Sequence, residues 1–257
     1  MRVIKRIVIM FLVLLFILGL TISLYPYFQG QAVDRELKEE AQSFLMEYEY
    51  IPLPDTIVSV PAAPEVQDRP AIVVPEIPRE HAELWDAMQK YNLTLWEEKQ
   101  SGLSDPWAYE QPSFTLGEYG LEDEIFGVIS IPVLDLEMPL YLGATYENMA
   151  AGATHLSQTS LPIGGENTNC VIAGHRGWKG ASYFRYITEL TEGDEVIITN
   201  LWETLTYQVT GIQIIDPNDV EKILIQEGRD MVTLLTCHPY ASGGRQRYLV
   251  FCDRINQ

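Results

Sequence analysis

The sequence predicts an all-β domain, a sandwich or a barrel, carried behind one membrane-spanning helix. Short β-rich runs separated by turn residues fill the chain from about residue 124 onward. No long helices alternate with these runs, as they would in a parallel α/β sheet. Near the N terminus stand eighteen consecutive uncharged, mostly apolar residues. The 257 residues are enough for one sizeable core with accessory segments.

Residues 7–24, IVIMFLVLLFILGLTISL, are expected to span the membrane. Three basic residues within the first six positions predict a cytoplasmic N terminus, and the aromatic flank YPYF at 25–28 suits the outer interface. The run is longer than a signal-peptide core, but a weak small-x-small site at 30–32 leaves a cleaved signal as the alternative. We therefore expect the bulk of the protein outside the membrane.

The segment between this run and the β-rich region contains two helical patterns and a linker. Residues 33–50 are charged and helical in character, and residues 79–100 place apolar side chains every three or four positions, at Leu84, Met88, Tyr91 and Leu95. Between them, residues 51–78 hold seven of the fifteen prolines, which predicts an extended linker.

Seven or eight strands are expected over the last 130 or so residues. The runs that predict them are FGVISIP, MPLYLG, CVIAGH, DEVIITN, TLTYQVTGIQIID, DMVTLLTC and RYLVFC.

The charge balance excludes some classes of partner. The net charge is −19, and the first 24 residues hold three of the 17 basic residues and none of the 36 acidic ones, so the rest carries −22. Such a surface repels nucleic acid and anionic lipid, and it keeps an exported domain soluble. No CxxC or HxxxH spacing suggests a metal site. The acidic stretch GLEDEIFG at 120–127 is a weak calcium candidate without an EF-hand pattern, and we expect no cofactor.

Cys237 ends the strand-like run TLLTC at 233–237 and is the candidate nucleophile. A cysteine nucleophile needs a base or cation beside it and a group that stabilises an oxyanion. Among the four histidines, His238 is adjacent and points to the opposite face of a continuing strand, and His81 lies on the expected accessory helix. His155 and His175 remain, and His175 follows an apolar strand at a glycine-flanked turn, where catalytic groups tend to stand.

The candidate cation is Arg247, which opens the last strand ten residues after Cys237. Arg245 is the rival, but Gly243-Gly244 places it in the turn of the expected hairpin. Each of these side chains alone also fits a packing or solvated role. Only their combination points to a catalytic site.

Two motifs resemble the sortase family, the cysteine transpeptidases of Gram-positive cell surfaces. TLLTC resembles the family's Thr-Leu-x-Thr-Cys signature, and GATHLSQTSLPIGGENTNCVIAGHRG at 152–177 resembles its class C, pilus-assembling branch. The resemblance spans roughly residues 79–254. It implies an eight-stranded β-barrel in which Cys237 is the nucleophile, His175 the acid/base partner and Arg247 the residue that steadies the substrate and the oxyanion.

A third match concerns Ser-Asp-Pro-Trp at 104–107, which resembles the lid of class C enzymes. The resemblance implies that Asp105, Pro106 and Trp107 form a lid, in which Asp105 pairs with Arg247 and Trp107 covers Cys237. A carboxylate suits a guanidinium and an indole can shield a sulfur, although a simple helix-terminating turn is the alternative.

The two remaining cysteines are expected to be packing residues. Cys170 lies five residues before His175 and Cys252 five after Arg247, and odd offsets on an unbroken strand put side chains on opposite faces.

These expectations divide the chain into a cytoplasmic tip and anchor at 1–28, accessory helices, linker and lid at 29–123, and a catalytic barrel at 124–257. The resemblance implies a single-pass enzyme of the Gram-positive cell surface that cleaves an LPxTG-like sorting signal between Thr and Gly through a thioester on Cys237. The expected partners are LPxTG-bearing surface proteins or pilin precursors and an amine acceptor, foremost a pilin lysine.

The same residues leave three alternative functions. The acceptor could instead be a peptidoglycan cross-bridge, as for a housekeeping sortase, or the barrel could be a non-catalytic pilus-assembly scaffold. A papain-like endopeptidase is disfavoured because its cysteine would precede its histidine, whereas here His175 comes first.

Overall fold

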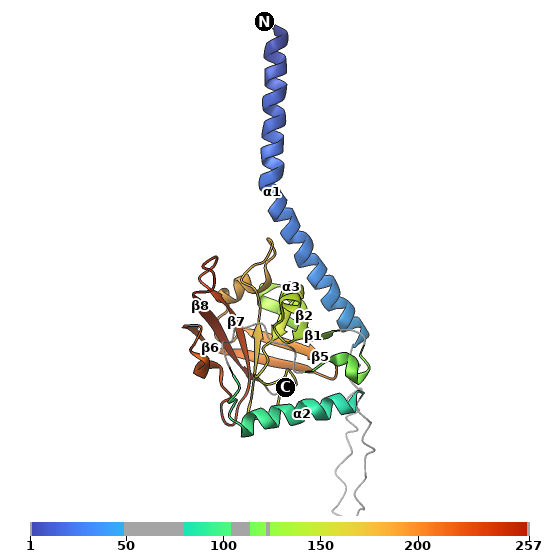
Figure 1. Ribbon diagram of the computed structural model, residues 1–257, viewed down its shortest axis with the longest axis vertical. Helices are drawn as coiled ribbons and strands as arrows, with labels where there is room; N and C mark the ends of the chain where they lie inside the picture. Colours follow the sequence, from blue (N-terminus) through green and yellow to red (C-terminus); the bar gives the residue numbers. More distant parts are fainter. Residues whose placement is uncertain (1, 49–79, 104–113, 122–123, 256–257) are drawn as a thin grey trace, which may run out of the picture.

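Eight strands close into a barrel in the order β1-β2-β3-β4-β7-β8-β6-β5 (Figure 1). The computed structural model describes residues 2–48, 80–103, 114–121 and 124–255. The all-β prediction is confirmed, and of the two architectures left open the barrel is correct. The strands are β1 (Ile125–Ile131), β2 (Leu136–Leu142), β3 (Ala153–His155), β4 (Thr168–Ala173), β5 (Glu195–Asn200), β6 (Thr204–Ile215), β7 (Asp230–His238) and β8 (Gln246–Arg254).

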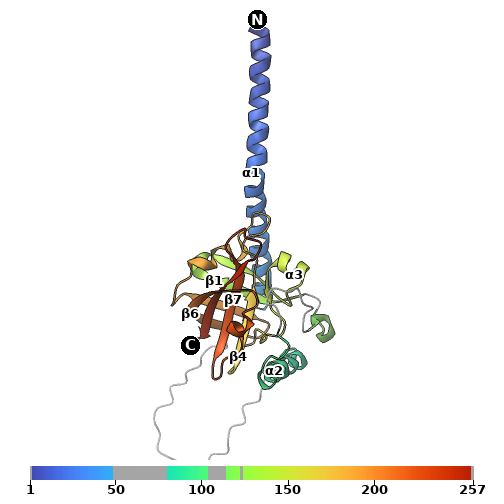
Figure 2. The same cartoon turned by 60° about the vertical axis from the view of Figure 1, so that its left-hand side comes forward.

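Helical elements cover the barrel and connect its strands. The α-helices are α1 (Arg2–Glu47), α2 (Ala82–Glu97) and α3 (Tyr146–Ala151), and the short 3-10 helices are η1 (Leu116–Tyr119), η2 (Pro132–Leu134), η3 (Tyr183–Glu189) and η4 (Val220–Ile223). Figures 1 and 2 place α2 at the end of the barrel away from the N terminus of α1.

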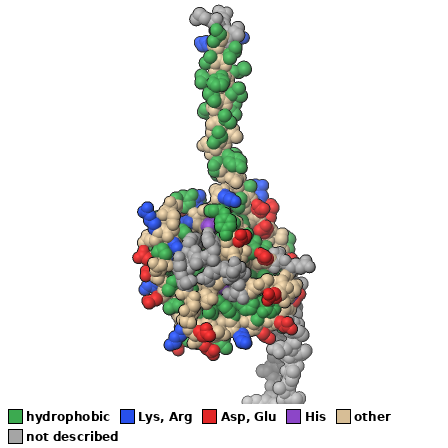
Figure 3. All heavy atoms as spheres, in the orientation of Figure 1, with side chains coloured by type: hydrophobic (Ala, Val, Ile, Leu, Met, Phe, Trp, Pro, Cys, Tyr) green, Lys and Arg blue, Asp and Glu red, His purple; other side chains and the backbone are tan. Residues whose placement is uncertain are grey.

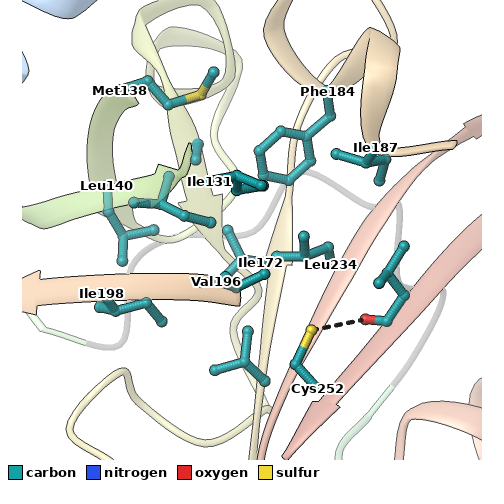
Figure 4. Packing of buried hydrophobic residues seen from close by; sticks show 14 of the residues in the cluster. Ile131, Met138, Leu140, Ile172, Phe184, Ile187, Val196, Ile198, Leu234 and Cys252 are labelled. Carbon is teal, nitrogen blue, oxygen red and sulfur yellow. Dashed lines mark hydrogen bonds between the residues drawn. The ribbon is translucent and has the colours of Figure 1, made fainter. Parts of the chain in front are cut away.

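The barrel interior is filled by side chains from every strand and from η3. In Figure 4, Phe184 and Ile187 of η3 pack over Ile131 and the strands below them. Interior and exterior side chains alternate along each strand because the side-chain period of a strand is two. Burying each of these side chains contributes roughly 1.5–3 kcal/mol relative to exposing it.

The two packing cysteines lie inside the barrel, as predicted. Cys170 and Cys252 are 3% and 0% exposed, and both stand opposite Val232 on the neighbouring strands. All three cysteines, including Cys237, are free thiols. Val232 belongs to the interior cluster, whereas Leu235 belongs to a cluster on the outer face, so Cys237 shares the outer face with Leu235.

Helix α2 packs on the outside of the barrel through the positions that its sequence pattern predicts. Leu84, Met88 and Leu95 are buried, and Asn92 exchanges two hydrogen bonds with the backbone of Leu161. Tyr91 is only partly buried. The helix anchors the loop that precedes β4.

Helix α1 is a single element where the sequence suggested two. It runs from Arg2 through Pro26 to Glu47, so residues 7–24 and residues 33–47 belong to one helix. By length and composition it is apolar enough to cross a membrane. Figure 3 shows hydrophobic side chains along its N-terminal half, which stands clear of the domain. Its C-terminal half packs on β1 and β2 through Leu37, Ala41 and Phe44.

Candidate active site

Strands β7 and β8 bring a thiol and a guanidinium together at one end of the barrel. Cys237 and Arg247 are direct partners in this antiparallel pair, whose Cβ atoms typically lie about 4.5–5.5 Å apart. Gly244, in the connecting turn, adopts a φ of 78°. A Cβ atom there would lie 3.3 Å from the Cys237 Sγ atom and 3.2 Å from the Arg247 Nη1 atom. The absent side chain keeps the approach to both groups open.

Arg247 is held in place by the same turn. Its Nη1 atom donates to the Gly244 carbonyl oxygen at 2.6 Å, and the residue is 4% exposed. The rival Arg245 precedes β8 and is exposed to solvent. The buried guanidinium beside the thiol is therefore that of Arg247.

The end of β4 brings His175 to the same place. Strand β4 runs parallel to β7 with Ala173 opposite Leu235. The pairing continues beyond β4, because the Gly174 amide donates to the Leu235 carbonyl at 3.1 Å and the Thr236 hydroxyl donates to the Gly174 carbonyl at 2.8 Å. Strand β4 ends at Ala173, and His175 follows two residues beyond it, just as Cys237 follows two residues after Leu235, so the parallel register leads both residues toward this end of the barrel.

An aromatic pair that sequence reasoning missed surrounds the His175 ring. Trp178 stacks on it with ring centroids 4.6 Å apart and an angle of 15° between the planes. Tyr183 meets it edge-on at 5.9 Å. Both separations are typical of favourable aromatic pairs. The rings therefore restrict the orientation of the imidazole, and the only sequence signal was a tryptophan three residues after the histidine.

Arg176 is a second cation that the sequence did not single out. Its Nη1 atom donates to the Cys237 carbonyl oxygen at 3.3 Å and to the Nδ1 atom of His238 at 2.6 Å. Because an arginine only donates, His238 accepts through Nδ1. His238 is thus engaged by Arg176, and the loop after β4 is tied to the end of β7.

Burial acts on both members of the candidate catalytic pair. It raises the pKa of the Cys237 thiol above its ordinary value, against the charges of Arg247 and Arg176, which act to lower it. It also lowers the pKa of the His175 imidazole. Both shifts favour the neutral form of the group concerned, the thiol at Cys237 and the uncharged imidazole at His175.

The other candidates lie elsewhere. His155 is fully buried on β3, and His81 precedes α2. The expected lid residues Asp105, Pro106 and Trp107 lie outside the described residues.

Comparison with known proteins finds one family. Residues 129–255 match the sortase domain. Sortase C1 of Streptococcus agalactiae is 34% identical with a TM-score of 0.64, over 69% of this chain and 91% of that one. Sortase C of Streptococcus pneumoniae is 37% identical with a TM-score of 0.62, over 69% and 89%.

Among curated proteins, sortase D of Bacillus subtilis is 28% identical over 131 residues, which are 50% of this chain and 63% of that protein. The chain spans between 47% and 63% of the length of the curated relatives it matches. The two solved sortases C are covered almost completely, at more than 30% identity and with the same barrel. The chain therefore belongs to the sortase family, as its motifs at 152–177 and 233–237 predict.

Proposed function

We propose that this protein is a membrane-anchored cysteine transpeptidase whose nucleophile is Cys237. The observation that carries the proposal is the direct pairing of Cys237 with Arg247 across β7 and β8, with His175 in the loop that directly follows β4, the strand beside β7. A nucleophile, an acid/base group and a cation for the oxyanion are the three parts that acyl transfer needs.

The reaction begins with attack of the Cys237 thiolate on the carbonyl carbon of the scissile Thr-Gly bond. The Arg247 guanidinium stabilises the charge that develops on the carbonyl oxygen. When the C–N bond breaks, the His175 imidazolium gives its proton to the leaving glycine amine, and a thioester on Cys237 remains. An incoming amine then gives its proton to His175 and forms a new amide, and Cys237 leaves as the thiolate.

The active protonation state is scarce. At ordinary pKa values, near 8.5 for cysteine and 6.5 for histidine, only about 1% of such pairs are thiolate plus imidazolium at neutral pH. Burial favours the neutral form of each group, whereas the charges of Arg247 and Arg176 and the mutual attraction of thiolate and imidazolium favour the ion pair. A neutral resting thiol is less exposed to oxidation on a cell surface, because oxidation follows thiolate character.

The donor is proposed to be an LPxTG-like sorting signal and the acceptor a pilin lysine. The likeness to sortases C, one of them described as a sortase of a pilus island, supports this acceptor. A peptidoglycan cross-bridge amine, as used by a housekeeping sortase, is the competing acceptor.

The N-terminal half of α1 is proposed to anchor the protein in the membrane, with its N terminus inside and the barrel outside. Asp105, Pro106 and Trp107 are proposed to form a lid over Cys237, which keeps water from the resting site and opens for substrate.

The test is product formation. The purified full chain in detergent is incubated with a fluorescent Leu-Pro-x-Thr-Gly peptide together with a lysine-bearing pilin peptide and an oligoglycine. We expect a ligated mass with the lysine peptide, its loss in Cys237→Ala, and its retention in Cys170→Ala, whose thiol lies inside the barrel. Preferential ligation to oligoglycine would favour the housekeeping function, and no ligation to either amine would favour the scaffold.

A further inference from the structure

The membrane-side helix touches the loop that carries the active-site histidine. A Cβ atom on Gly30 of α1 would lie 2.1 Å from the carbonyl oxygen of Gly180, and one on Gly180 would lie 2.4 Å from the carbonyl oxygen of Pro26. Backbone meets backbone here, and only glycine permits so close an approach. Gly180 is two residues from Trp178, the ring stacked on His175.

A hydrogen-bonded contact fixes the helix on the same loop one turn further along. The Asp34 carboxylate accepts from the Ser182 amide at 2.8 Å and from the Ser182 hydroxyl at 3.2 Å. Helix and loop are thus joined at Gly30 and at Asp34, and the position of the loop along the helix is set.

That position gives the loop a depth relative to the bilayer. The apolar run ends at Leu24, and with a rise of about 1.5 Å per residue Pro26 and Gly30 lie roughly 3 Å and 9 Å beyond it along the helix axis. The polar zone on each side of the hydrocarbon core is about 5–8 Å thick. The apolar run itself is about 27 Å long, close to the roughly 30 Å core. The loop at Gly180 therefore lies at headgroup level.

The side chains around this end of the barrel are those typical of a membrane interface. We define the mouth rim as Tyr146, Trp178, Lys179, Arg185 and Tyr240. Tyr146 and Tyr240 are 57% and 51% exposed, and Lys179 is exposed.

Ring contacts join the rim residues in two groups. Tyr146 meets Trp178 edge-on at 6.4 Å, Lys179 lies over the Trp178 ring at 5.8 Å, and Arg185 lies over the Tyr240 ring at 4.3 Å. Tryptophan and tyrosine concentrate at membrane–water interfaces, and lysine and arginine bind lipid phosphates there.

The local charge is opposite to that of the rest of the exported domain. Segments 175–188 and 237–247, which form this end of the barrel, hold five lysines and arginines and no acidic residue. The chain after residue 24 has 36 acidic residues against 14 basic ones. The net charge of the chain predicted repulsion from anionic lipid, but these two segments are themselves basic, with Asp34 of α1 and Glu147 of α3 as acidic neighbours.

We infer that the mouth rim docks on the phosphate headgroups of the membrane in which α1 is anchored, so that the Cys237 site opens toward the lipid surface. The inference rests on the proposed anchor. A donor held in the same membrane then reaches Cys237 along the surface. The lysines and arginines of the two rim segments favour this orientation on an anionic surface.

The test measures how close the rim lies to lipid headgroups. In a Cys237→Ala background, Ala241→Cys beside Tyr240 and, as a matched control, Glu227→Cys before the opposite end of β7 are labelled with an environment-sensitive fluorophore. The full chain is incorporated into vesicles of phosphatidylcholine and phosphatidylglycerol that carry a nitroxide on the headgroup. We expect quenching at 241 at least threefold stronger than at 227.

Two outcomes would overturn the inference, and they are distinguishable. If the protein migrates with the vesicles in a flotation gradient but both labels are quenched equally, the rim does not dock on the membrane, although α1 is anchored in it. If the protein does not float with the vesicles, the anchor itself is wrong. The ligation assay of the proposed function is independent of either result.

A pair of variants on α1 tests the link between helix and rim. Gly30→Leu should separate the helix from Gly180 and lower the quenching at 241, because the added side chain meets backbone that cannot yield. Gly19→Leu is the matched control, since a Cβ there meets nothing within 4 Å among the described residues. Unchanged quenching in Gly30→Leu would contradict the inferred coupling.

Discussion

His155 should make the barrel sensitive to mild acid. Its ring is fully buried on β3, where Nε2 donates to the Thr159 carbonyl at 3.1 Å and Nδ1 has no hydrogen-bond partner among the described residues. Burial lowers the pKa of His155 from 6.5 to about 4. Above pH 6.5 the ring is neutral in both states. Between pH 6.5 and 4 the unfolded chain takes up the proton and the folded chain does not, so stability is lost.

The size of this effect follows from the shift. At 1.36 kcal/mol per pKa unit, the difference between 6.5 and about 4 corresponds to about 3 kcal/mol lost between pH 7 and pH 4. The variant His155→Gln keeps a donor for Thr159 but does not titrate. Carboxylates that titrate in the same range act equally in both proteins, so they cancel from the comparison.

The assay is urea unfolding of the full chain in detergent at pH 7, 5.5 and 4. We expect wild type to lose about 3 kcal/mol more than His155→Gln over this range. The variant His81→Gln, on the segment before α2, should behave as wild type. Equal losses in wild type and His155→Gln would refute the reasoning, because the buried ring would then not resist protonation.

Three further predictions concern the site. Arg176→Met should slow the alkylation of Cys237 by iodoacetamide at pH 7, because removing this charge raises the pKa of the thiol further. Arg176→Lys keeps the charge and should retain most of the rate. An unchanged rate in the methionine variant would contradict this prediction. Thr236→Val should lower the free energy of unfolding in urea by about 1–3 kcal/mol, because the buried Gly174 carbonyl loses its hydroxyl donor. Thr236→Ser keeps the hydroxyl and should restore the stability. An unchanged free energy of unfolding in the valine variant would count against that hydrogen bond. Asp105→Ala should speed the same alkylation if the proposed lid covers the thiol, and identical labelling rates would argue against a lid.

The strands were predictable because their signals are local. Seven of the eight strands coincide with apolar runs bounded by turn residues. Strand β3 was not anticipated, since its three residues, Ala153–His155, are all buried and too few to show alternation. Its parallel pairing with β2 and antiparallel pairing with β4 depend on long-range closure of the barrel.

The course of α1 shows where local signals mislead. The sequence indicated a membrane span at 7–24 and a separate helical pattern at 33–50, and Pro26 and Gly30, which disfavour helix interiors, stand between them. In the structure the helix continues through them. Gly30 is explained by a contact with Gly180, 150 residues away, which no local pattern contains.

The candidate site divides in the same way. Cys237, His175 and Arg247 could be proposed from motifs and strand ends, because each stands at a recognisable boundary between strand and turn. Trp178 and Arg176 could not, since their roles depend on the path of the loop after β4. The stacking of Trp178 on His175 exists only in three dimensions.

The central claim is that the thiol of Cys237 carries the acyl group. It is tested most directly by incubating the protein with a sorting-signal peptide in the absence of any added amine, quenching in acid, and locating the adduct by mass spectrometry of the digested chain. The account predicts a thioester to the threonine carbonyl on the peptide that contains Cys237, absent from Cys237→Ala. An adduct on Cys170 or Cys252, or ligated product from Cys237→Ala, would contradict it.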